Sequence, residues 1–299
     1  MCNTTGGNQI CVTRVVKTFR IRTYLLMGVW SLVVSGCVAI AESSEVGVLI
    51  LAHGAGPEWN GQVQKAVEEA KIPYPTEIAF GMGMMPQEVE NIQKAVQRLE
   101  SQGIRRIRAI PLLVSSYSSV YRQYEYLLGL RPEPSWPHHP VNPVKLQADV
   151  RMGRALDDSS LVAQVLLERA LGLSKEPAKE AVLLVGHGPE EDPDNEKWLA
   201  AMQSLGDRVQ REGRFAAIAA ATLRDDAPAA VKEEAIRRLR SQAVSLSKSY
   251  RVLVVPLLMS KNGIEQKIAH ALEGLPAVYT GEALLPHANI SRWIREQVE

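Results

Sequence analysis

The strongest constraint on the fold is an internal repeat in which a strand-like apolar run ends in a His-Gly pair. The runs VGVLILA (46–52) and AVLLVG (181–186) lead into His53 and His187, and a polar turn follows each pair. In both halves of the chain, further short apolar runs alternate with segments of helical period. This is the pattern of βαβ units on a parallel sheet. The chain is therefore predicted to contain two copies of one α/β unit.

Matches elsewhere in the two halves support duplication. IPLLVSS (110–116) corresponds to VPLLMSK (255–261), and the closing helix LVAQVLLERA corresponds to ISRWIREQ. The central runs are continuous in Val, Leu and Ile, which favours strands buried on both faces. We predict an α/β fold of two tandem three-layer α/β/α lobes with parallel sheets, over residues 46–174 and 180–299.

Residues 1–41 have a different composition from the rest of the chain. Arg and Lys precede the uncharged stretch TYLLMGVWSLVVSGCVAIA, and no acidic residue occurs before Glu42. This is typical of an export signal. Three outcomes are compatible with it: cleavage after the small-residue pair Ala39 and Ala41, an uncleaved membrane anchor, or lipidation of Cys37 in VSGC. An upstream mis-assigned start codon of a cytoplasmic protein is the remaining interpretation.

Charge and motif content exclude several functional classes. The 34 basic and 33 acidic residues give a net charge of +1, so no overall positive field would attract nucleic acid. All three cysteines lie within the first 41 residues, which leaves no thiolate ligand and no disulfide in the two predicted lobes. P-loop, GxGxxG, HExxH and GxSxG motifs are absent, so no nucleotide cofactor is expected.

The predicted topology sorts the candidate site residues. In open parallel sheets, ligands bind in the crevice beyond the carboxyl ends of the strands. His53 and His187 follow the first strand of each half and are expected to face this crevice. Alternatively, each imidazole merely caps its own strand-to-helix turn.

Other candidates follow the second, third or fourth strand of either half, and therefore belong to the same edge. A hydroxyl there can bind a carboxylate or phosphate, or can simply cap a helix. The methionine in GMGMM is a soft ligand or a packing residue. The candidates for the substrate are Ser115, Ser116, Tyr117, Met82, Arg224, Lys261 and Asn262, and His287 is a further candidate metal ligand beside His53 and His187.

The Pro-rich segment PEPSWPHHPVNP (132–143) contains two adjacent histidines but joins a helix to the next strand. Such connections lie at the amino ends of the strands. The segment is therefore predicted to be a surface insertion away from the site.

These motifs together resemble the sirohydrochlorin cobaltochelatase and ferrochelatase family, the class II chelatases. The resemblance rests on a first strand ending in His-Gly, a central strand ending in Pro-Leu-Leu, a Pro-His segment before the last helix, and the tandem duplication. It covers roughly residues 46–299. It implies two lobes that face one cleft and insert a divalent metal, cobalt or iron with nickel or zinc as possibilities, into a sirohydrochlorin-type tetrapyrrole without ATP.

The sequence departs from this family pattern at two places. Members carry a second histidine shortly after the central-strand proline, where this chain has 117–119 in one half and 262–264 in the other. They also carry an acidic residue after the second strand, where Met82 and Arg224 stand here. By the resemblance, His53 and His187 bind metal or accept protons, while Lys261 and Arg224 contact substrate carboxylates. A non-catalytic exported protein that binds metal or a tetrapyrrole is the alternative function.

Overall fold

The computed structural model describes residues 45–299, which belong to one compact unit, Glu42–Glu299. The predicted export segment lies outside the described residues. Among the helices that are described, none has the length and apolar character needed to cross a bilayer.

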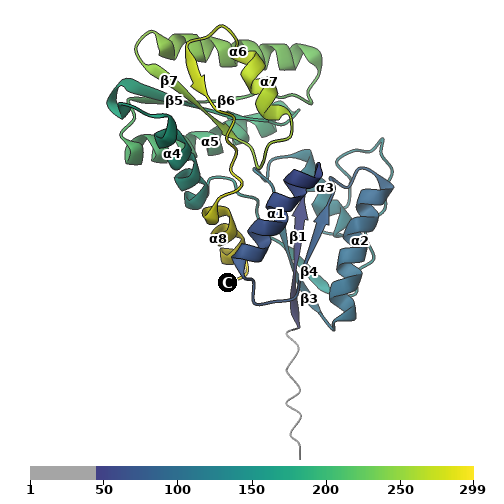
Figure 1. Cartoon of the computed structure of the whole chain (residues 1–299). Coiled ribbons are helices and arrows are strands. Elements are labelled where there is room, and N and C mark those ends of the chain that lie inside the picture. The colour runs from purple at the N-terminus through teal and green to yellow at the C-terminus, as the bar shows by residue number, and fades with distance from the viewer. Residues whose placement is uncertain (1–44) are drawn as a thin grey trace, which may run out of the picture. The chain divides into compact units, whose positions relative to one another are not determined.

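The first half of the chain forms a four-stranded parallel sheet in the order β2-β1-β3-β4. Its strands are β1 (Val46–Ala52), β2 (Thr76–Phe80), β3 (Arg106–Leu112) and β4 (Asp149–Met152). The helices in this half are α1 (Pro57–Ala70), α2 (Pro86–Ser101), α3 (Ser119–Leu127) and α4 (Ser160–Leu173). The fold class predicted from the sequence is confirmed for this half (Figure 1).

The second half repeats the same topology, in the order β6-β5-β7-β8. Its strands are β5 (Glu180–Gly186), β6 (Ala217–Thr222), β7 (Arg251–Leu257) and β8 (Ala277–Tyr279). The helices are α5 (Asp192–Gly213), α6 (Ala229–Ser247), α7 (Ile264–Ala271) and α8 (Ala288–Glu296), and a 3-10 turn, η1 (Pro177–Lys179), precedes β5. Two four-stranded parallel sheets of equal order are thus present, as predicted.

Both central strands contain a proline, which sheet interiors usually exclude because proline cannot donate to the ladder. Pro111 in β3 and Pro256 in β7 nevertheless each pair with the neighbouring first strand. On the other side of each central strand the ladder has already ended, at Ala109 with β4 and at Val254 with β8. The repeated prolines therefore lie where only one neighbouring strand remains.

The closing helix of each half packs against the other half. Helix α4 contacts α5 and β7 of the second sheet, whereas α8 contacts α1 of the first. Arg108 in β3 donates to the backbone carbonyl of Val298, with an Nη1–O distance of 2.6 Å. The predicted lobe limits, 46–174 and 180–299, thus separate the two sheets but not the helices that cover them.

One hydrophobic core runs through both halves as a result. It combines the inner faces of β1 and β5 with apolar residues of α1, α4, α5 and α8. Two smaller cores lie on the outer faces, one under α2 and α3 and the other under α6 and α7. Each sheet is therefore covered on both faces, and the inner helical layer is shared.

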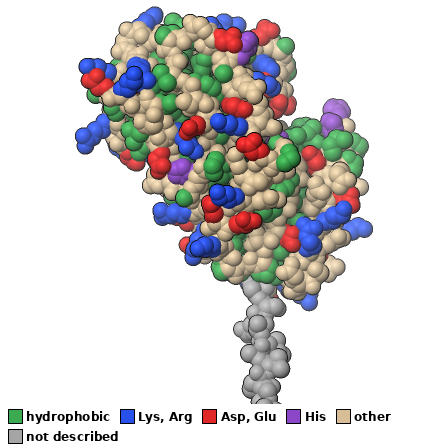
Figure 2. All heavy atoms as spheres, viewed as in Figure 1, with side chains coloured by type: hydrophobic (Ala, Val, Ile, Leu, Met, Phe, Trp, Pro, Cys, Tyr) green, Lys and Arg blue, Asp and Glu red, His purple; other side chains and the backbone are tan. Residues whose placement is uncertain are grey.

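Polar contacts also join the halves beside the carboxyl ends of the strands. Arg122 and Asp194 form an ion pair with an Nη1–Oδ2 distance of 2.6 Å. The indole of Trp198 donates to the backbone carbonyl of Tyr117 at 2.7 Å. Because these groups are part-buried, they fix the position of α5 against the first half. Elsewhere on the face seen in Figure 2, acidic and basic side chains are interspersed, in keeping with the small net charge.

Candidate metal and ligand site

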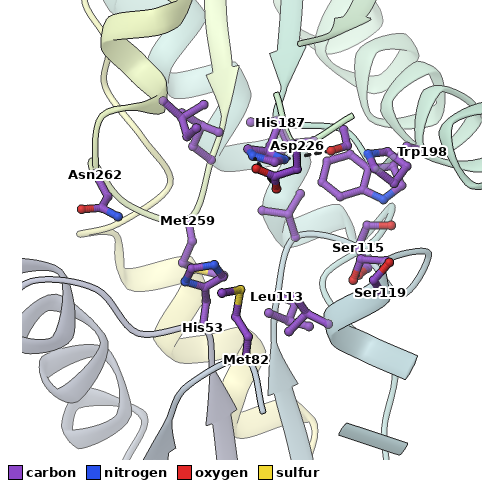
Figure 3. A pocket seen from close by; sticks show the side chains of 18 of the residues that line it. His53, Met82, Leu113, Ser115, Ser119, His187, Trp198, Asp226, Met259 and Asn262 are labelled. Carbon is purple, nitrogen blue, oxygen red and sulfur yellow. Dashed lines mark hydrogen bonds and ion pairs between the residues drawn. The ribbon is translucent and has the colours of Figure 1, made fainter. Parts of the chain in front are cut away.

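A cavity of about 500 Å³ lies where the carboxyl ends of the two sheets approach each other. Its volume is in the range of pockets that bind small organic molecules. The residues that line it come from both halves (Figure 3): His53, Trp59, Met82, Met84, Leu112, Leu113, Val114, Ser115, Ser118, Ser119, Val120, Trp136, His187, Gly188, Pro189, Glu190, Trp198, Asp226, Leu257, Leu258, Met259, Ser260, Asn262 and Ile264.

The two repeated histidines have the same local geometry. The Nδ1 atom of His53 lies 2.7 Å from the carbonyl oxygen of Gly54, and that of His187 lies 2.8 Å from the carbonyl oxygen of Gly188. A carbonyl oxygen only accepts, so Nδ1 carries the proton in both rings. In each neutral imidazole, Nε2 therefore holds the free lone pair that can bind a metal or accept a proton.

The glycine in each His-Gly pair is required by this geometry. Gly54 and Gly188 both adopt φ of +76°, where a side chain is disfavoured. A Cβ on Gly188 would lie 2.5 Å from the Cβ of Thr222, at the end of β6, and one on Gly54 would lie 3.0 Å from the Cβ of Phe80, at the end of β2. The turn thus brings the histidine close against the end of the second strand.

In the second half, His187 has acidic neighbours. Its Nε2 lies 3.4 Å from Oδ2 of Asp226, and Figure 3 shows the two side chains together at the cavity. Ligand atoms of His187, Asp225 and Asp226 all lie within 4.8 Å of one another. One imidazole nitrogen and carboxylate oxygens suit a divalent first-row cation. Asp226 thus provides an acidic residue after the second strand of this half, two positions beyond Arg224.

The first half presents a different set of donors. His53 is exposed to the cavity beside the thioether side chains of Met82 and Met259 (Figure 3). Its ring centroid is 6.4 Å from that of Trp59. The loop that carries Met82 is anchored by Tyr124, whose hydroxyl donates to the carbonyl of Gly81 at 2.8 Å. Burial raises the pKa of Tyr124, so this hydroxyl remains a neutral donor.

Some serines of the cluster after β3 line the cavity, whereas Ser116 is hydrogen-bonded within the protein. Ser115 lines the cavity and is buried. Ser116 faces away from it, because its backbone N–H and its hydroxyl both donate to Asp157 at 2.8 Å. The charged groups of Arg154 and Lys197 lie 5.6 and 5.2 Å from the centroid of the Tyr117 ring. Neither Ser116 nor Tyr117 is among the lining residues, whereas Ser118 lines the cavity and also caps α3.

Arg224 is bound within the protein rather than presented to a ligand. Its side chain is buried, with hydrogen bonds to the carbonyls of Pro189 and Glu190 and an ion pair with Asp192. Arg224 was predicted to contact the substrate, but this network instead holds the start of α5 in place. Lys261 is exposed and does not line the cavity, whereas its neighbour Asn262 does.

His287 does not reach the cavity. It caps α8, with Nδ1 accepting from the backbone N–H of Asn289 at 3.1 Å, and its Nε2 lies 2.9 Å from Oε2 of Glu168. Both ring nitrogens are therefore occupied. The sequence placed His287 after the fourth strand, but α8 turns it toward α4, so the role of metal ligand does not fit its position.

Tryptophan side chains that were not predicted from the sequence form part of the cavity wall. Trp59 comes from α1, Trp198 from α5, and Trp136 from the Pro-rich segment predicted to lie at the opposite edge of the sheet. The segment is tied to α3 through the backbone N–H of Ser135, which donates to Oε1 of Gln123 at 2.9 Å. The connection is long enough to run back along α3. The prediction that the segment lies away from the site was therefore wrong for Trp136, because spacing alone does not show where a long loop runs. His138 and His139 are exposed and do not line the cavity.

Charge distribution in the cavity is one-sided. Of the described residues that line it, none is lysine or arginine, and the acidic ones are Glu190 and Asp226. The remaining surface is formed mainly by tryptophan, methionine and aliphatic side chains. The arrangement can therefore hold a cation at one wall and a flat apolar ligand between the others.

The fold and the site define a class of two-lobed α/β proteins in which paired parallel sheets present imidazoles to a common cavity. The CbiX family profile matches residues 47–172. The matched segment contains nearly the whole first sheet and most of the helices of the first half. The resemblance inferred from the sequence is thereby confirmed.

Individual relatives are distant in sequence. A sirohydrochlorin cobaltochelatase from Methanococcoides burtonii is 22% identical over 134 residues, which is 43% of this chain and 97% of that protein. Among solved structures, SirB from Bacillus subtilis with Fe3+ superimposes with a TM-score of 0.58 and 17% identity, covering 85% of this chain and 95% of SirB. The second likeness shows a shared fold across both halves.

Proposed function

We propose that the protein inserts a divalent metal, cobalt or ferrous iron, into a sirohydrochlorin-type tetrapyrrole bound in the cavity between the lobes. The observation that carries the proposal is the pairing of His187 with Asp226 at one wall, opposite a second imidazole, His53, at the other. The relatives named above support the choice of reaction. The metal is a substrate here, and no nucleotide is involved.

The two walls fit the two requirements of metal insertion. A cation must be held near the macrocycle, and the pyrrole N–H protons must be accepted as the metal enters. His187 and Asp226 supply nitrogen and oxygen ligands. Since Nδ1 of His53 is committed to Gly54, its Nε2 is the atom that would accept a proton. The tryptophans and methionines would contact the faces of the macrocycle.

Cobalt binding and insertion by separate variants test these roles. His187→Ala should weaken Co²⁺ binding more than the roughly 10–100-fold loss typical when only a supporting partner of a ligand is removed. His53→Ala should leave Co²⁺ binding intact and slow insertion into sirohydrochlorin by about 100-fold or more. His139→Ala, an exposed histidine in the Pro-rich segment that does not line the cavity, is the matched control. Unchanged binding and insertion in both cavity variants would refute the assignment.

One observation favours a second function, a carrier of metal or tetrapyrrole without catalysis. No lysine or arginine side chain is among the described lining residues, and Asn262 stands where the family pattern has a second histidine. Such a site can retain a ligand without driving insertion. Stoichiometric binding of haem or Co²⁺ by the purified protein, with no conversion of sirohydrochlorin, would select the carrier.

Export remains part of the proposal, on the basis of residues 1–41. Either function would then operate outside the cytoplasm or at the membrane surface. Mass spectrometry of the processed N-terminus distinguishes a cleaved, a lipidated and a retained segment.

A further inference from the structure

A second cavity, of about 650 Å³, lies in the second half between α6 and α7. It is separate from the site described above and has the opposite charge. The residues lining it are Leu223, Asp225, Lys232, Ile236, Arg240, Gly263, Gln266, Lys267, His270 and Ala271. Two lysines and one arginine thus line the cavity together with one carboxylate.

Asp225 organises this cluster. Its carboxylate forms ion pairs with Lys232 and Lys267, and its side chain is 7% exposed. Burial acts to raise the pKa of Asp225, but the two lysines outweigh it and hold the pKa below its ordinary value. Asp225 is therefore ionised and neutralises only part of the positive charge. Arg240 is fixed at the rim, where its Nη1 donates to the carbonyls of Ala271 and Glu273.

Asp225 also lies close to two residues that line the first cavity. One of its oxygens lies within 4.8 Å of ligand atoms of both His187 and Asp226. The same carboxylate thus stands between two sites, and it is bound to lysine on one side while a cation would attract it on the other. The two interactions compete for one group.

We propose that the cavity between α6 and α7 binds a small anion bearing a carboxylate or phosphate group, and that this anion releases Asp225 from Lys232 and Lys267 to bind the cation held by His187. The anion replaces Asp225 as the partner of the lysines, so the cluster remains neutralised. A third ligand then strengthens cation binding. By linkage, a bound cation strengthens anion binding by the same factor. This coupling rests on the proposed metal site, whereas the anion site itself does not.

Two sources can supply the anion, a free small molecule or a side-chain carboxylate of the tetrapyrrole itself. Sulfate is the probe for the first, because it binds Co²⁺ weakly. A carboxylated porphyrin is the probe for the second. If the porphyrin displaces bound sulfate, the macrocycle supplies the group, and if both bind together, the site takes a free anion.

Isothermal titration of the full-length protein with sulfate, at constant ionic strength balanced with chloride, tests the site directly. We expect saturable binding that Lys267→Gln weakens by about tenfold or more, as for the loss of a charge-assisted hydrogen bond. Lys248→Gln, an exposed lysine at the end of α6, should leave sulfate binding unchanged. Absence of saturable binding, or equal weakening in the two variants, would overturn the anion site.

Cobalt titrations test the coupling. Saturating sulfate should raise Co²⁺ affinity by about fivefold or more in the unmodified protein and leave it unchanged in Asp225→Asn. Lys267→Gln should raise Co²⁺ affinity without sulfate, because Asp225 has then lost one partner. If sulfate binds and Co²⁺ affinity does not respond, the coupling is wrong. Loss of Co²⁺ binding in His187→Ala is measured without sulfate, so this measurement tests the metal site independently of the anion site.

Discussion

Replacing Gly188 by alanine tests why the His-Gly pair occurs twice. The added Cβ meets two obstacles, the φ of +76° and the Cβ of Thr222 at 2.5 Å. Thr222 cannot move aside easily. Its backbone pairs with Gly186 in the sheet, and its hydroxyl donates to Oδ1 of Asn195 at 2.7 Å. The clash therefore has to be relieved by displacing the turn that positions His187.

The expected magnitude follows from these two obstacles. A left-handed conformation costs an alanine roughly 1–2 kcal/mol, and an overpacked contact between fixed atoms costs about 1–3 kcal/mol more. Gly188→Ala should therefore lower the free energy of unfolding by about 2–5 kcal/mol. Because the carbonyl of Gly188 also accepts from the imidazole, Co²⁺ binding should weaken in the same variant.

Two other glycines give a graded comparison. Gly54→Ala has the same φ but a looser contact, 3.0 Å to Phe80, and should cost about 1–3 kcal/mol. Gly172 lies in α4 with no atom within 4 Å of an added Cβ, so Gly172→Ala should stabilise the protein by about 0.5–1 kcal/mol.

Urea unfolding followed by circular dichroism measures all three variants under one set of conditions. The expected order of stability is Gly172→Ala, then the unmodified protein, then Gly54→Ala, then Gly188→Ala. If Gly188→Ala is as stable as the unmodified protein, the turn is not constrained as described. The repeated glycines would then need another explanation.

Three further predictions concern other described residues. Glu180 is buried and forms an ion pair with Arg251. Burial opposes ionisation of Glu180, but its hydrogen bonds outweigh burial and hold its pKa below the ordinary value. The contribution of Glu180 to stability is therefore present above the unfolded pKa and is lost as pH falls through the folded pKa. The stability difference between the unmodified protein and Glu180→Gln should therefore shrink between pH 7 and pH 3 in urea titrations, and a constant difference would contradict the assignment. Trp136→Ala should weaken porphyrin binding by about tenfold in fluorescence titrations while Co²⁺ affinity stays unchanged; a parallel loss of both would instead indicate misfolding. Tyr124→Phe leaves the buried carbonyl of Gly81 without its donor and should cost about 1–3 kcal/mol in urea unfolding, and a neutral result would show that the loop does not depend on this bond.

Local features of the sequence predicted local features of the fold well. The strands VGVLILA and AVLLVG and the serine that caps α3 occur as expected, because apolar period and capping act over a few residues. The interior position of the third strand in each sheet was predicted because its run is continuous in Val, Leu and Ile. His53 and His187 were expected at one crevice because ligands bind beyond the carboxyl ends of parallel strands, and both line the cavity.

What the sequence did not show is which partner each segment packs against. Helix α4 is apolar on several faces, since Leu161, Val162, Ala163, Val165 and Leu166 are all buried. Such a pattern indicates a helix enclosed by its neighbours, but it does not say that the neighbours belong to the other lobe. Likewise, Arg224 and Asp226 are equivalent in sequence as charged residues after β6. The left-handed φ of +53° at Arg224 directs the loop so that one is buried and the other faces the cavity.

The exchange of α4 and α8 has a consequence for how such a chain could have arisen. The last helix of each half packs against the other half. A one-lobed ancestor with this connectivity would therefore have exchanged its last helix with a second copy of the chain, as an intertwined homodimer. Once two such copies are joined in one polypeptide, the sequences of the two halves no longer have to be identical. One half presents a carboxylate beside its imidazole and the other presents thioethers, a difference that a symmetric homodimer would not show.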